Sequence, residues 1–265
     1  MFIHSLDPVF VDLGIISIRW YSLAYIFGIL SGWWLGRKII YFRKNNSNIS
    51  FEDKEFDDLV TWIILSIIIG GRIGYILFYN FDYYRESPLE ILKIWQGGMS
   101  FHGALIAVIV ATYYFSIKKR LKPFFFLDVI ACVAPIGLFF GRIANFINGE
   151  LFGKPTNIYW SVIFPEHDNL PRHPSQIYEA LLEGLVLFVI LNLFIFKKKY
   201  QIGLCSILFL TLYGVFRIFS EFFREPDVQI GYIFNFLSMG TFLSIIMIFV
   251  GIILFIKSDK NEFNK

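Results

Sequence analysis

A run of ten residues, GRIANFINGE (141–150), places an arginine, two asparagines and a glutamate at the end of a long apolar stretch. Such side chains are expensive inside a membrane and usually mark a functional site there. A guanidinium binds phosphate through two parallel N–H groups, and asparagine amides can donate to glycerol or phosphate oxygens. Arg142, Asn145 and Gly149 share one helical face, and Glu150 follows. The run predicts a lipid-headgroup site; a polar network that caps the helix is the alternative.

A second polar stripe lies near the end of another apolar run, in YGVFRIFSEFFRE. Tyr213, Arg217, Glu221 and Arg224 are spaced by four, four and three residues, so a helix presents them on one face. A neighbouring carboxylate makes a buried arginine more tolerable and leaves other guanidinium donors for a ligand. We therefore expect Arg217 to bind substrate. For Glu221 and Arg224, the alternative is a self-contained salt bridge that holds the helices together.

The segment WQGGMSFHGA (95–104) contains a candidate general base. Gly97 and Gly98 interrupt a helix, and irregular backbone at membrane depth is tolerated only beside protein or water. His102 should therefore face a polar interior, where an imidazole with a reference pKa of about 6.5 can accept a proton. A hydrogen bond to a neighbouring helix is the structural alternative. Ser100 and His102 point apart on a helix, so a serine nucleophile is not expected.

A third arginine lies inside an apolar run, in IIGGRIGYILFYN. Arg72, Tyr75 and Tyr79 share one helical face. Gly70 and Gly74 form a small-xxx-small pair, which permits the close approach of a second helix. Two interpretations of Arg72 stay open: it contacts a ligand, or it fixes a pair of helices.

The composition indicates which elements must position these side chains. The chain has 265 residues, of which 56% are hydrophobic and 17% charged, and its mean hydropathy is +0.61. A soluble domain of this size cannot bury so much apolar surface. About 20 apolar residues span the hydrocarbon. We therefore predict an all-α membrane protein, a bundle of seven transmembrane helices in a single integral membrane domain (1–265). The seven spans are centred near Ala24, Ile67, Val108, Pro135, Val189, Leu210 and Met247.

The basic residues predict the orientation. Most of them cluster in alternate connections: Arg37, Lys38, Arg43, Lys44 and Lys54; Lys118, Lys119, Arg120 and Lys122; Lys197, Lys198 and Lys199; Lys257, Lys260 and Lys265. By the positive-inside rule, the N-terminus is outside and the C-terminus is cytoplasmic. The N-terminal residues lack the basic region of a cleavable signal peptide. Because the basic residues are divided among short loops beside the lipid bilayer, no nucleic-acid partner is expected.

Between the fourth and fifth spans, a short segment rich in proline and polar residues is predicted to cap the polar interior from outside. It ends in the turn RHPSQ, which leads into a helix with Tyr178, Glu179 and Glu183. His102, His173 and Glu150 lack the spacing of metal ligands, so no metal site is expected. Cys132 and Cys205 lie in apolar runs and are interpreted as packing residues.

Five segments together resemble the prolipoprotein diacylglyceryl transferase family: GGRIGYILFYN, GGMSFHGALI, GRIANFINGELFG, LPRHPSQIYEALLEG and YGVFRIFSEFFREPD. They extend from the second to the sixth span, and GRxxNFxNGELxG is the family's signature. The resemblance implies a multi-pass enzyme of the bacterial plasma (inner) membrane whose active site faces the outer, periplasmic side. Such enzymes move the diacylglyceryl group of phosphatidylglycerol to the lipobox cysteine of a prolipoprotein signal peptide. They release glycerol 1-phosphate and use no cofactor.

The resemblance also implies roles for individual residues. Arg142 matches the arginine that binds phosphatidylglycerol. Other positions on which the family relies are matched by Tyr21, His102, Asn145, Glu150, Gly153, Tyr213, Arg217 and Glu221. We expect His102 to be the general base toward the cysteine thiol, while Arg142 and Arg217 neutralise the phosphate.

Two other classes of protein place charges at membrane depth. A lipid or solute transporter usually has broken helices related by an internal repeat, and GRIANFINGE has no second copy. An intramembrane hydrolase needs a nucleophile or a metal, and no residue set of that kind is evident. The sequence therefore favours the transferase.

Overall fold

The computed structural model describes residues 2–14, 17–46, 53–94, 97–226, 231–233 and 237–258. Trp95 and Gln96 of the WQGGMSFHGA segment lie outside these residues, as do Lys260 and Lys265. The chain divides into two compact units. The first unit takes residues 1–40, 128–227 and 231–265, and the second takes 41–127 and 228–230.

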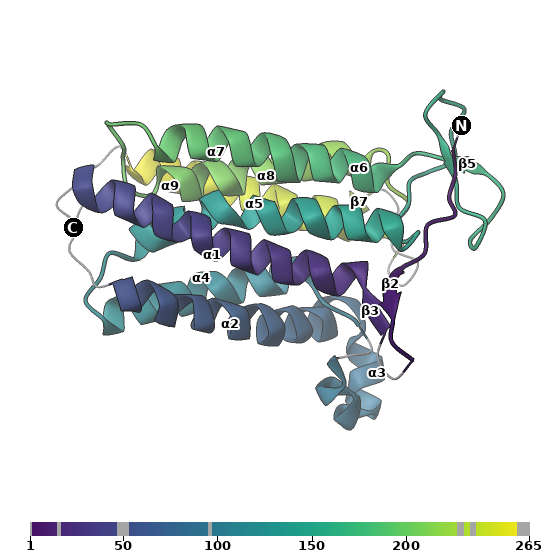
Figure 1. Cartoon of the computed structure of the whole chain (residues 1–265), viewed down its shortest axis with the longest axis horizontal. Coiled ribbons are helices and arrows are strands. Elements are labelled where there is room, and N and C mark those ends of the chain that lie inside the picture. Colours follow the sequence, from purple (N-terminus) through teal and green to yellow (C-terminus); the bar gives the residue numbers. More distant parts are fainter. Residues whose placement is uncertain are drawn as a thin grey trace. The chain divides into compact units, whose positions relative to one another are not determined.

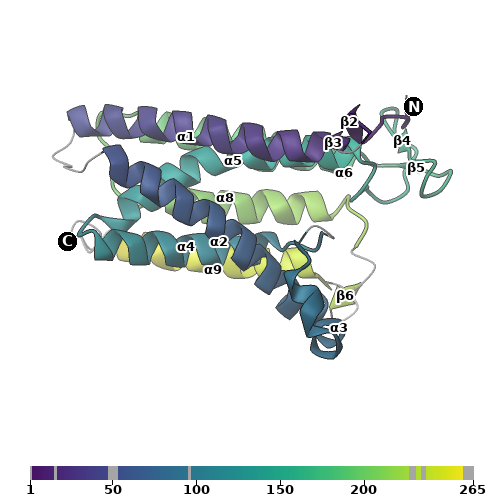
Figure 2. The same cartoon turned by 60° about the horizontal axis from the view of Figure 1, so that its bottom comes forward.

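The second unit is built on two long helices, α2 (Asp53–Tyr79) and α4 (Phe101–Lys118). Between them come a short helix, α3 (Phe81–Glu86), and a 3-10 turn, η1 (Pro88–Leu92). Figure 2 shows α2 and α4 crossing closely. A Cβ atom added to Gly74 would lie 2.5 Å from the Cα atom of Gly103, so the predicted close approach of a second helix is confirmed.

The first unit contains most of α1 (Trp20–Asn46) and of α5 (Pro123–Ile147), together with α8 (Leu204–Glu221) and α9 (Met239–Ser258). A further helix is continuous from 175 to 195 and consists of α6 (Ser175–Glu179), a π-helical segment η3 (Ala180–Val186) and α7 (Leu187–Ile195). These helices run side by side in Figure 1. The α1 and α5 backbones approach closely, since a Cβ atom on Gly28 would lie 3.0 Å from the Cα atom of Gly137.

A buried carboxylate fixes the start of α8 against α5. Asp128 accepts hydrogen bonds from the backbone N–H groups of Gly203 (2.5 Å) and Ser206 (2.6 Å), and from the hydroxyls of Ser206 and Tyr200. Gly203 caps the helix, and its positive φ of 93° favours glycine. The unpaired amides at the start of α8 are thereby satisfied.

Short strands, which the sequence did not predict, accompany the helices. In the first unit, β1 (Phe2–Ile3) pairs in parallel with β4 (Val162–Ile163), and β4 pairs with antiparallel β5 (Pro171–Arg172). The N-terminal strand therefore joins the segment between α5 and α6. Two small hairpins are formed by β2 (Val9–Asp12) with β3 (Ser17–Arg19), and by β6 (Tyr232–Ile233) with β7 (Leu237–Ser238).

Six helical segments among the described residues are long and apolar enough to cross a membrane. They are Lys54–Tyr79, Phe101–Lys118, Pro123–Ile147, Ser175–Ile195, Leu204–Glu221 and Met239–Ser258. The predicted span that is missing from these six is the first, centred near Ala24, and it corresponds to α1. This helix has 27 residues but includes three tryptophans, three tyrosines and four basic residues, which lower its hydropathy. The chain is thus a mostly helical, multi-pass membrane protein with six candidate spans among the described residues, and α1 is less apolar than these six.

Candidate active site

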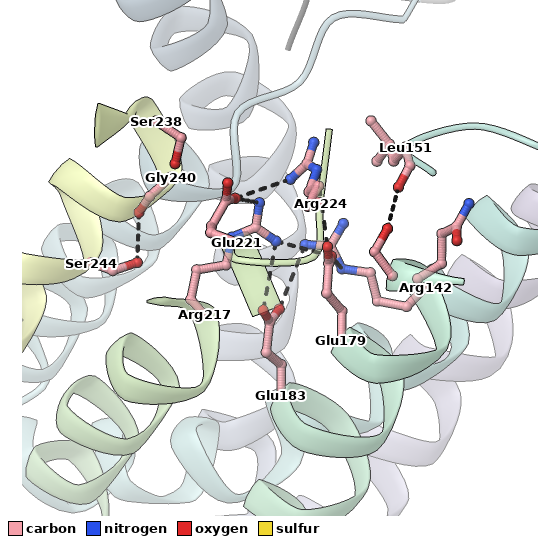
Figure 3. Close-up of polar contacts among 12 residues, drawn as sticks. Arg142, Leu151, Glu179, Glu183, Arg217, Glu221, Arg224, Ser238, Gly240 and Ser244 are labelled. Atoms are coloured by element: carbon pink, nitrogen blue, oxygen red, sulfur yellow. Dashed lines mark hydrogen bonds and ion pairs between the residues drawn. The ribbon is translucent and has the colours of Figure 1, made fainter. Parts of the chain in front are cut away.

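Six largely buried side chains of the first unit form one network, which we call the arginine–glutamate cluster (Figure 3). They come from α5, from the helix of α6 and η3, from α8 and from the residues that follow α8. It consists of Arg142, Glu179, Glu183, Arg217, Glu221 and Arg224. The three arginine side chains are 15%, 6% and 7% exposed in chain order. Three guanidinium groups thus face three carboxyl groups, so the formal charges balance when all six groups are ionised.

Glu179 has the most central position in this cluster. Its Oε2 atom lies 2.8 Å from Nε of Arg142 and 2.9 Å from Nη1 of Arg217. Its Oε1 atom lies 4.0 Å from Nε of Arg224. One carboxylate therefore contacts arginines from α5, from α8 and from the residues that follow α8.

The other two carboxylates surround the arginines less evenly. Glu183 lies 3.6 Å from both Arg142 and Arg217 and has no exposed side-chain surface. Glu221 bonds to Nη2 of Arg217 and lies 3.5 Å from Nη1 of Arg224. The self-contained salt bridge considered for Glu221 and Arg224 is therefore present, and it extends to Arg217.

The local helix geometry brings the carboxylates to Arg142. Glu179 is the last residue of α6, and Glu183 lies in the π-helical segment η3, a rare conformation that is frequent at functional sites. Gly184, also in η3, packs against α5, where an added Cβ atom would lie 2.7 Å from the Cβ of Phe139. This contact holds the two helices close together, one turn from Arg142.

Glu179 and Glu183 received no role in the sequence analysis, although they are central here. Two carboxylates four residues apart in an apolar span carry the same signal that identified the arginines, because each is expensive to bury. Charge balance could have identified them, because several buried arginines require counter-ions. Glu179 and Glu183 are the acidic residues of the apolar span that follows Arg142 in the chain, so they were the nearest candidates for this role.

The amide side chains of GRIANFINGE form a network at the end of α5. The Nδ2 groups of Asn145 and Asn148 donate to Oε1 of Glu150 at 2.8 and 3.3 Å. Gly149 has a φ of +68°, which ends the helix, and the Gln176 amide donates to the Glu150 carbonyl at 2.6 Å. The capping alternative for these residues is therefore realised in the structure.

Gly153 lies where two backbone segments meet. A Cβ atom on it would lie 2.4 Å from the carbonyl oxygen of His173 and 2.6 Å from that of Phe223. Its own carbonyl accepts a hydrogen bond from Nη1 of Arg172 at 3.0 Å. Only glycine fits here, and the contact joins the segment between α5 and α6 to the residues just before Arg224.

Ion pairs of Arg172 join the segment between α5 and α6 to the residues that follow α8. Arg172 lies 2.6 Å from Asp168 and 3.1 Å from Glu225, and the hydrogen bond from Arg172 lowers the pKa of the Asp168 carboxyl. Partial burial, helped by the charge of Lys154, lowers the pKa of His173. Its backbone N–H donates to the Lys154 carbonyl at 3.0 Å, which holds the turn before α6 against that segment.

The two predicted tyrosines occupy different surroundings in the first unit. Tyr213 is 1% exposed, stacks on Phe209 at 5.7 Å and precedes Arg217 by one helical turn. Tyr21 lies in the first turn of α1, with its ring 5.2 Å from that of Tyr25. The structure therefore groups Tyr213 with the polar face of α8.

Comparison with known proteins identifies the family. A model of the prolipoprotein diacylglyceryl transferase family matches residues 8–257. The chain belongs to this family. Three relatives carry the name phosphatidylglycerol–prolipoprotein diacylglyceryl transferase. The one from Rickettsia bellii (strain OSU 85-389) is 51% identical over 264 residues, covering 98% of both chains. That from Ehrlichia canis is 50% identical (93% of this chain, 94% of its own), and that from Rhodospirillum rubrum is 49% identical (95% and 92%).

The transferase predicted from the sequence is thereby confirmed. Family membership also decides against the transporter and hydrolase alternatives, because the family model and all three relatives carry the name of a transferase. Within the described residues, no group of three or more His, Cys, Asp or Glu side chains has the arrangement of a metal site.

In this family member, His102 belongs to the second unit, whereas the other predicted site residues all belong to the first. It is 7% exposed in the first turn of α4, with its ring 5.4 Å from that of Phe101. Ser100 caps the helix, because its hydroxyl oxygen accepts a hydrogen bond from the backbone N–H of Gly103. The backbone N–H of Ser100 donates to the Gly71 carbonyl at 2.9 Å, which ties the start of α4 to α2.

Arg72 of the same unit is surrounded by backbone carbonyl oxygens. Its guanidinium donates to those of Glu90, Ile91, Lys93, Gly97 and Gly98 at distances from 2.5 to 3.4 Å. Both glycines have positive φ angles, of 84° and 79°, as the chain turns around this side chain. The geometry favours the structural interpretation of Arg72.

Proposed function

We propose that the arginine–glutamate cluster binds the phosphate of phosphatidylglycerol while the protein transfers its diacylglyceryl group to the lipobox cysteine of a prolipoprotein. One observation carries this proposal: Arg142 and Arg217 both lie within 3 Å of a single oxygen, Oε2 of Glu179. A carboxylate oxygen between two guanidiniums stands in for a phosphate oxygen, because arginine forms the same charge-assisted hydrogen bonds with both. The family supplies the substrate that carries this phosphate.

The reaction explains why two arginines are needed. The cysteine sulfur attacks the glyceryl carbon that bears the phosphate ester, so a C–S bond forms as the C–O bond breaks. The phosphate of phosphatidylglycerol is a diester with one negative charge, and it leaves as glycerol 1-phosphate, a monoester that approaches two. Arg142 and Arg217 stabilise this added charge, which develops in the transition state, and therefore lower the barrier.

His102 is the proposed base. The attacking group is the thiolate, and a cysteine thiol with a reference pKa of about 8.5 is mostly protonated at pH 7. A neutral imidazole takes that proton as sulfur attacks. Its position in the first turn of α4, held by the Ser100 cap, fixes the ring in the second unit. The remaining site residues bind the substrate or shape the walls of its site: Tyr21, Tyr213, Asn145, Glu150, Gly153 and Glu221.

The proposed topology has seven transmembrane helices, with α1 added to the six apolar ones, and an active site toward the periplasm. Three features support it. The N-terminal strand β1 pairs with β4 of the cap, and α1 runs away from that end (Figure 1). The cluster lies near this same end, where α5 finishes and α6 begins. Basic side chains occur in the last turns of α1, α4 and α9. The positive-inside rule then places the cap outside the bacterial inner membrane.

Mass spectrometry tests this function directly. A synthetic lipobox peptide is incubated with the purified protein and phosphatidylglycerol in detergent. We expect the cysteine to gain one diacylglyceryl group, with glycerol 1-phosphate released in equal amount; a peptide whose cysteine is replaced by serine is the control. An unmodified peptide in the presence of folded protein, with other phospholipids also inactive, would contradict the proposal. Movement of labelled lipid across vesicle membranes would then support a transporter.

A further inference from the structure

The carboxylate of Glu179 occupies the place that the proposed function gives to the substrate phosphate. It is 1% exposed, and its Oε2 atom accepts a hydrogen bond from Arg217 and forms an ion pair with Nε of Arg142 at 2.8 Å. Within the described part of the chain, Oε1 accepts no hydrogen bond and faces Arg224 at 4.0 Å. An anionic ligand must therefore compete with Glu179 for guanidinium donors of Arg142 and Arg217.

We infer, on the basis of the proposed function, that Glu179 is an exchangeable counter-ion. It pairs with Arg142 and Arg217 when the headgroup site holds no ligand, and a phosphomonoester or phosphodiester group displaces it from them. The displaced carboxylate turns toward Arg224, whose Nε is already within ion-pair distance of Oε1. When glycerol 1-phosphate is the ligand, the return of Glu179 to Arg142 and Arg217 expels it.

The geometry assigns this role to Glu179 rather than to the other two carboxylates. Glu221 contacts Arg217 and Arg224 and shows no ion pair with Arg142 among the described residues. Glu183 lies between Arg142 and Arg217 but stays 3.6 Å from each. Glu179 alone in the described cluster has contacts below 3 Å with both arginines and a third arginine to which it can move.

Electrostatics favours the exchange. Buried guanidiniums need close counter-ions because they have lost their hydration, and Glu183 at 3.6 Å is a more distant partner of Arg142 and Arg217 than Glu179 is. A carboxylate that stayed in place beside a phosphate dianion would repel it at short range in a low dielectric. Glu179 keeps the arginines paired before the phosphate arrives, and it weakens the binding of every anion that replaces it.

Replacement of this carboxylate by an isosteric amide separates the counter-ion role from a purely structural one. In Glu179→Gln we expect glycerol 1-phosphate to inhibit transfer, and to bind in calorimetry, about tenfold more tightly, which corresponds to about 1.4 kcal/mol. The turnover number kcat should fall as product release slows. If Glu179 only braces the cluster, its loss would loosen Arg142 and Arg217 and weaken product binding. Weaker or unchanged binding in the folded variant overturns the inference.

Two controls complete the experiment. Asp128→Asn removes another buried carboxylate of the first unit, outside the cluster, and should leave the affinity for glycerol 1-phosphate unchanged. If Glu179→Gln does not fold, Glu179→Asp is used: its shorter side chain withdraws from the arginines, so product binding should still tighten, and weakening overturns the inference. The wild-type transfer assay is done first. Its failure removes the proposed function, whereas transfer without tighter binding in the variants removes only the exchange.

Discussion

Two buried arginines of this chain are held in opposite ways. In the second unit, Arg72 donates to five backbone carbonyl oxygens between residues 90 and 98. In the first unit, Arg217 pairs with the side chains of Glu179, Glu183 and Glu221. Backbone acceptors cannot leave without unfolding their segment, but a carboxylate can rotate away and be replaced by another anion.

The difference indicates which arginine can bind a ligand. Arg72 holds the described backbone of residues 90–94 and 97–98, which leads to Ser100 and His102. This arginine therefore positions backbone. The partners of Arg217 are carboxylates, which accept the same charge-assisted hydrogen bonds as a phosphate, and we infer that one of them, Glu179, is exchanged for the phosphate. Burial alone therefore does not distinguish a binding arginine from a structural one; the nature of the acceptors does.

His102 tests whether the segment that Arg72 orders serves catalysis. In His102→Ala the thiol loses its proposed base, and general-base groups contribute about 10²- to 10⁴-fold. We expect kcat for peptide transfer to fall by about a thousandfold, while binding of phosphatidylglycerol to the protein in detergent stays within about twofold, because the arginines remain. Full activity in this variant would remove His102 from the mechanism and leave the ordered segment without a catalytic purpose.

Arg142→Lys tests the ligand-binding side of the comparison. Lysine keeps the positive charge but loses the planar fork that binds two oxygens. Removal of one donor to a developing anion costs about 10²- to 10³-fold, so we expect kcat/KM to fall by at least about a hundredfold. The thermal unfolding midpoint should change by only a few degrees, since an ammonium still neutralises Glu179. Wild-type activity with lysine would show that the fork is not required.

Arg72→Lys is the matched substitution on the structural side. A lysine cannot reach five carbonyl oxygens, and each buried acceptor left without a donor costs about 1–3 kcal/mol. We expect the unfolding midpoint to drop by several degrees, more than in Arg142→Lys. Activity should fall about tenfold through kcat, with the KM for phosphatidylglycerol unchanged. A large rise in KM with normal stability would instead make Arg72 a lipid-binding residue.

The sequence predicted the arginines of the site but not how their charges are balanced. Arg142, Arg217 and Glu221 stood out because charged residues are rare in apolar runs, and their helical spacing was sufficient to place them on polar faces. Glu179 and Glu183 were missed because their pairing is between helices, and helical periodicity says nothing about which helix faces which. The π-helical segment around Glu183 likewise depends on the contact of Gly184 with Phe139.

The same limit applies to the fold. The helices followed from runs of apolar residues, and the close approach of a second helix to α2 followed from Gly70 and Gly74, although the sequence did not identify that helix as α4. The pairing of residues 2–3 with 162–163 could not be predicted, because strands of two residues have no periodicity and join segments far apart in the chain. Gly153 was included in the site by resemblance, and only the structure shows that two carbonyl oxygens exclude a side chain there.

The partly exposed ion pair of Arg172 with Asp168 gives the smallest expected effect and marks the far end of the comparison. Arg172 bonds to Asp168, whose pKa is lowered by that bond, but Asp168 lies at the surface, where water and salt weaken the pair.

A carboxyl with a depressed pKa stabilises the fold above its unfolded pKa of about 3.9 and loses this contribution as the pH falls through its folded value. Asp168→Asn should therefore lower the unfolding midpoint by at most about two degrees at pH 7, and this difference should disappear once acidification protonates Asp168 in the folded protein. Transfer activity should stay near that of the wild type, because Arg172 keeps Glu225 and the Gly153 carbonyl as partners. A loss of activity comparable to that of Arg142→Lys would mean that this partly exposed ion pair controls the site as strongly as the buried arginine–glutamate cluster does. That result would contradict the view that only an arginine with exchangeable carboxylate partners binds the substrate.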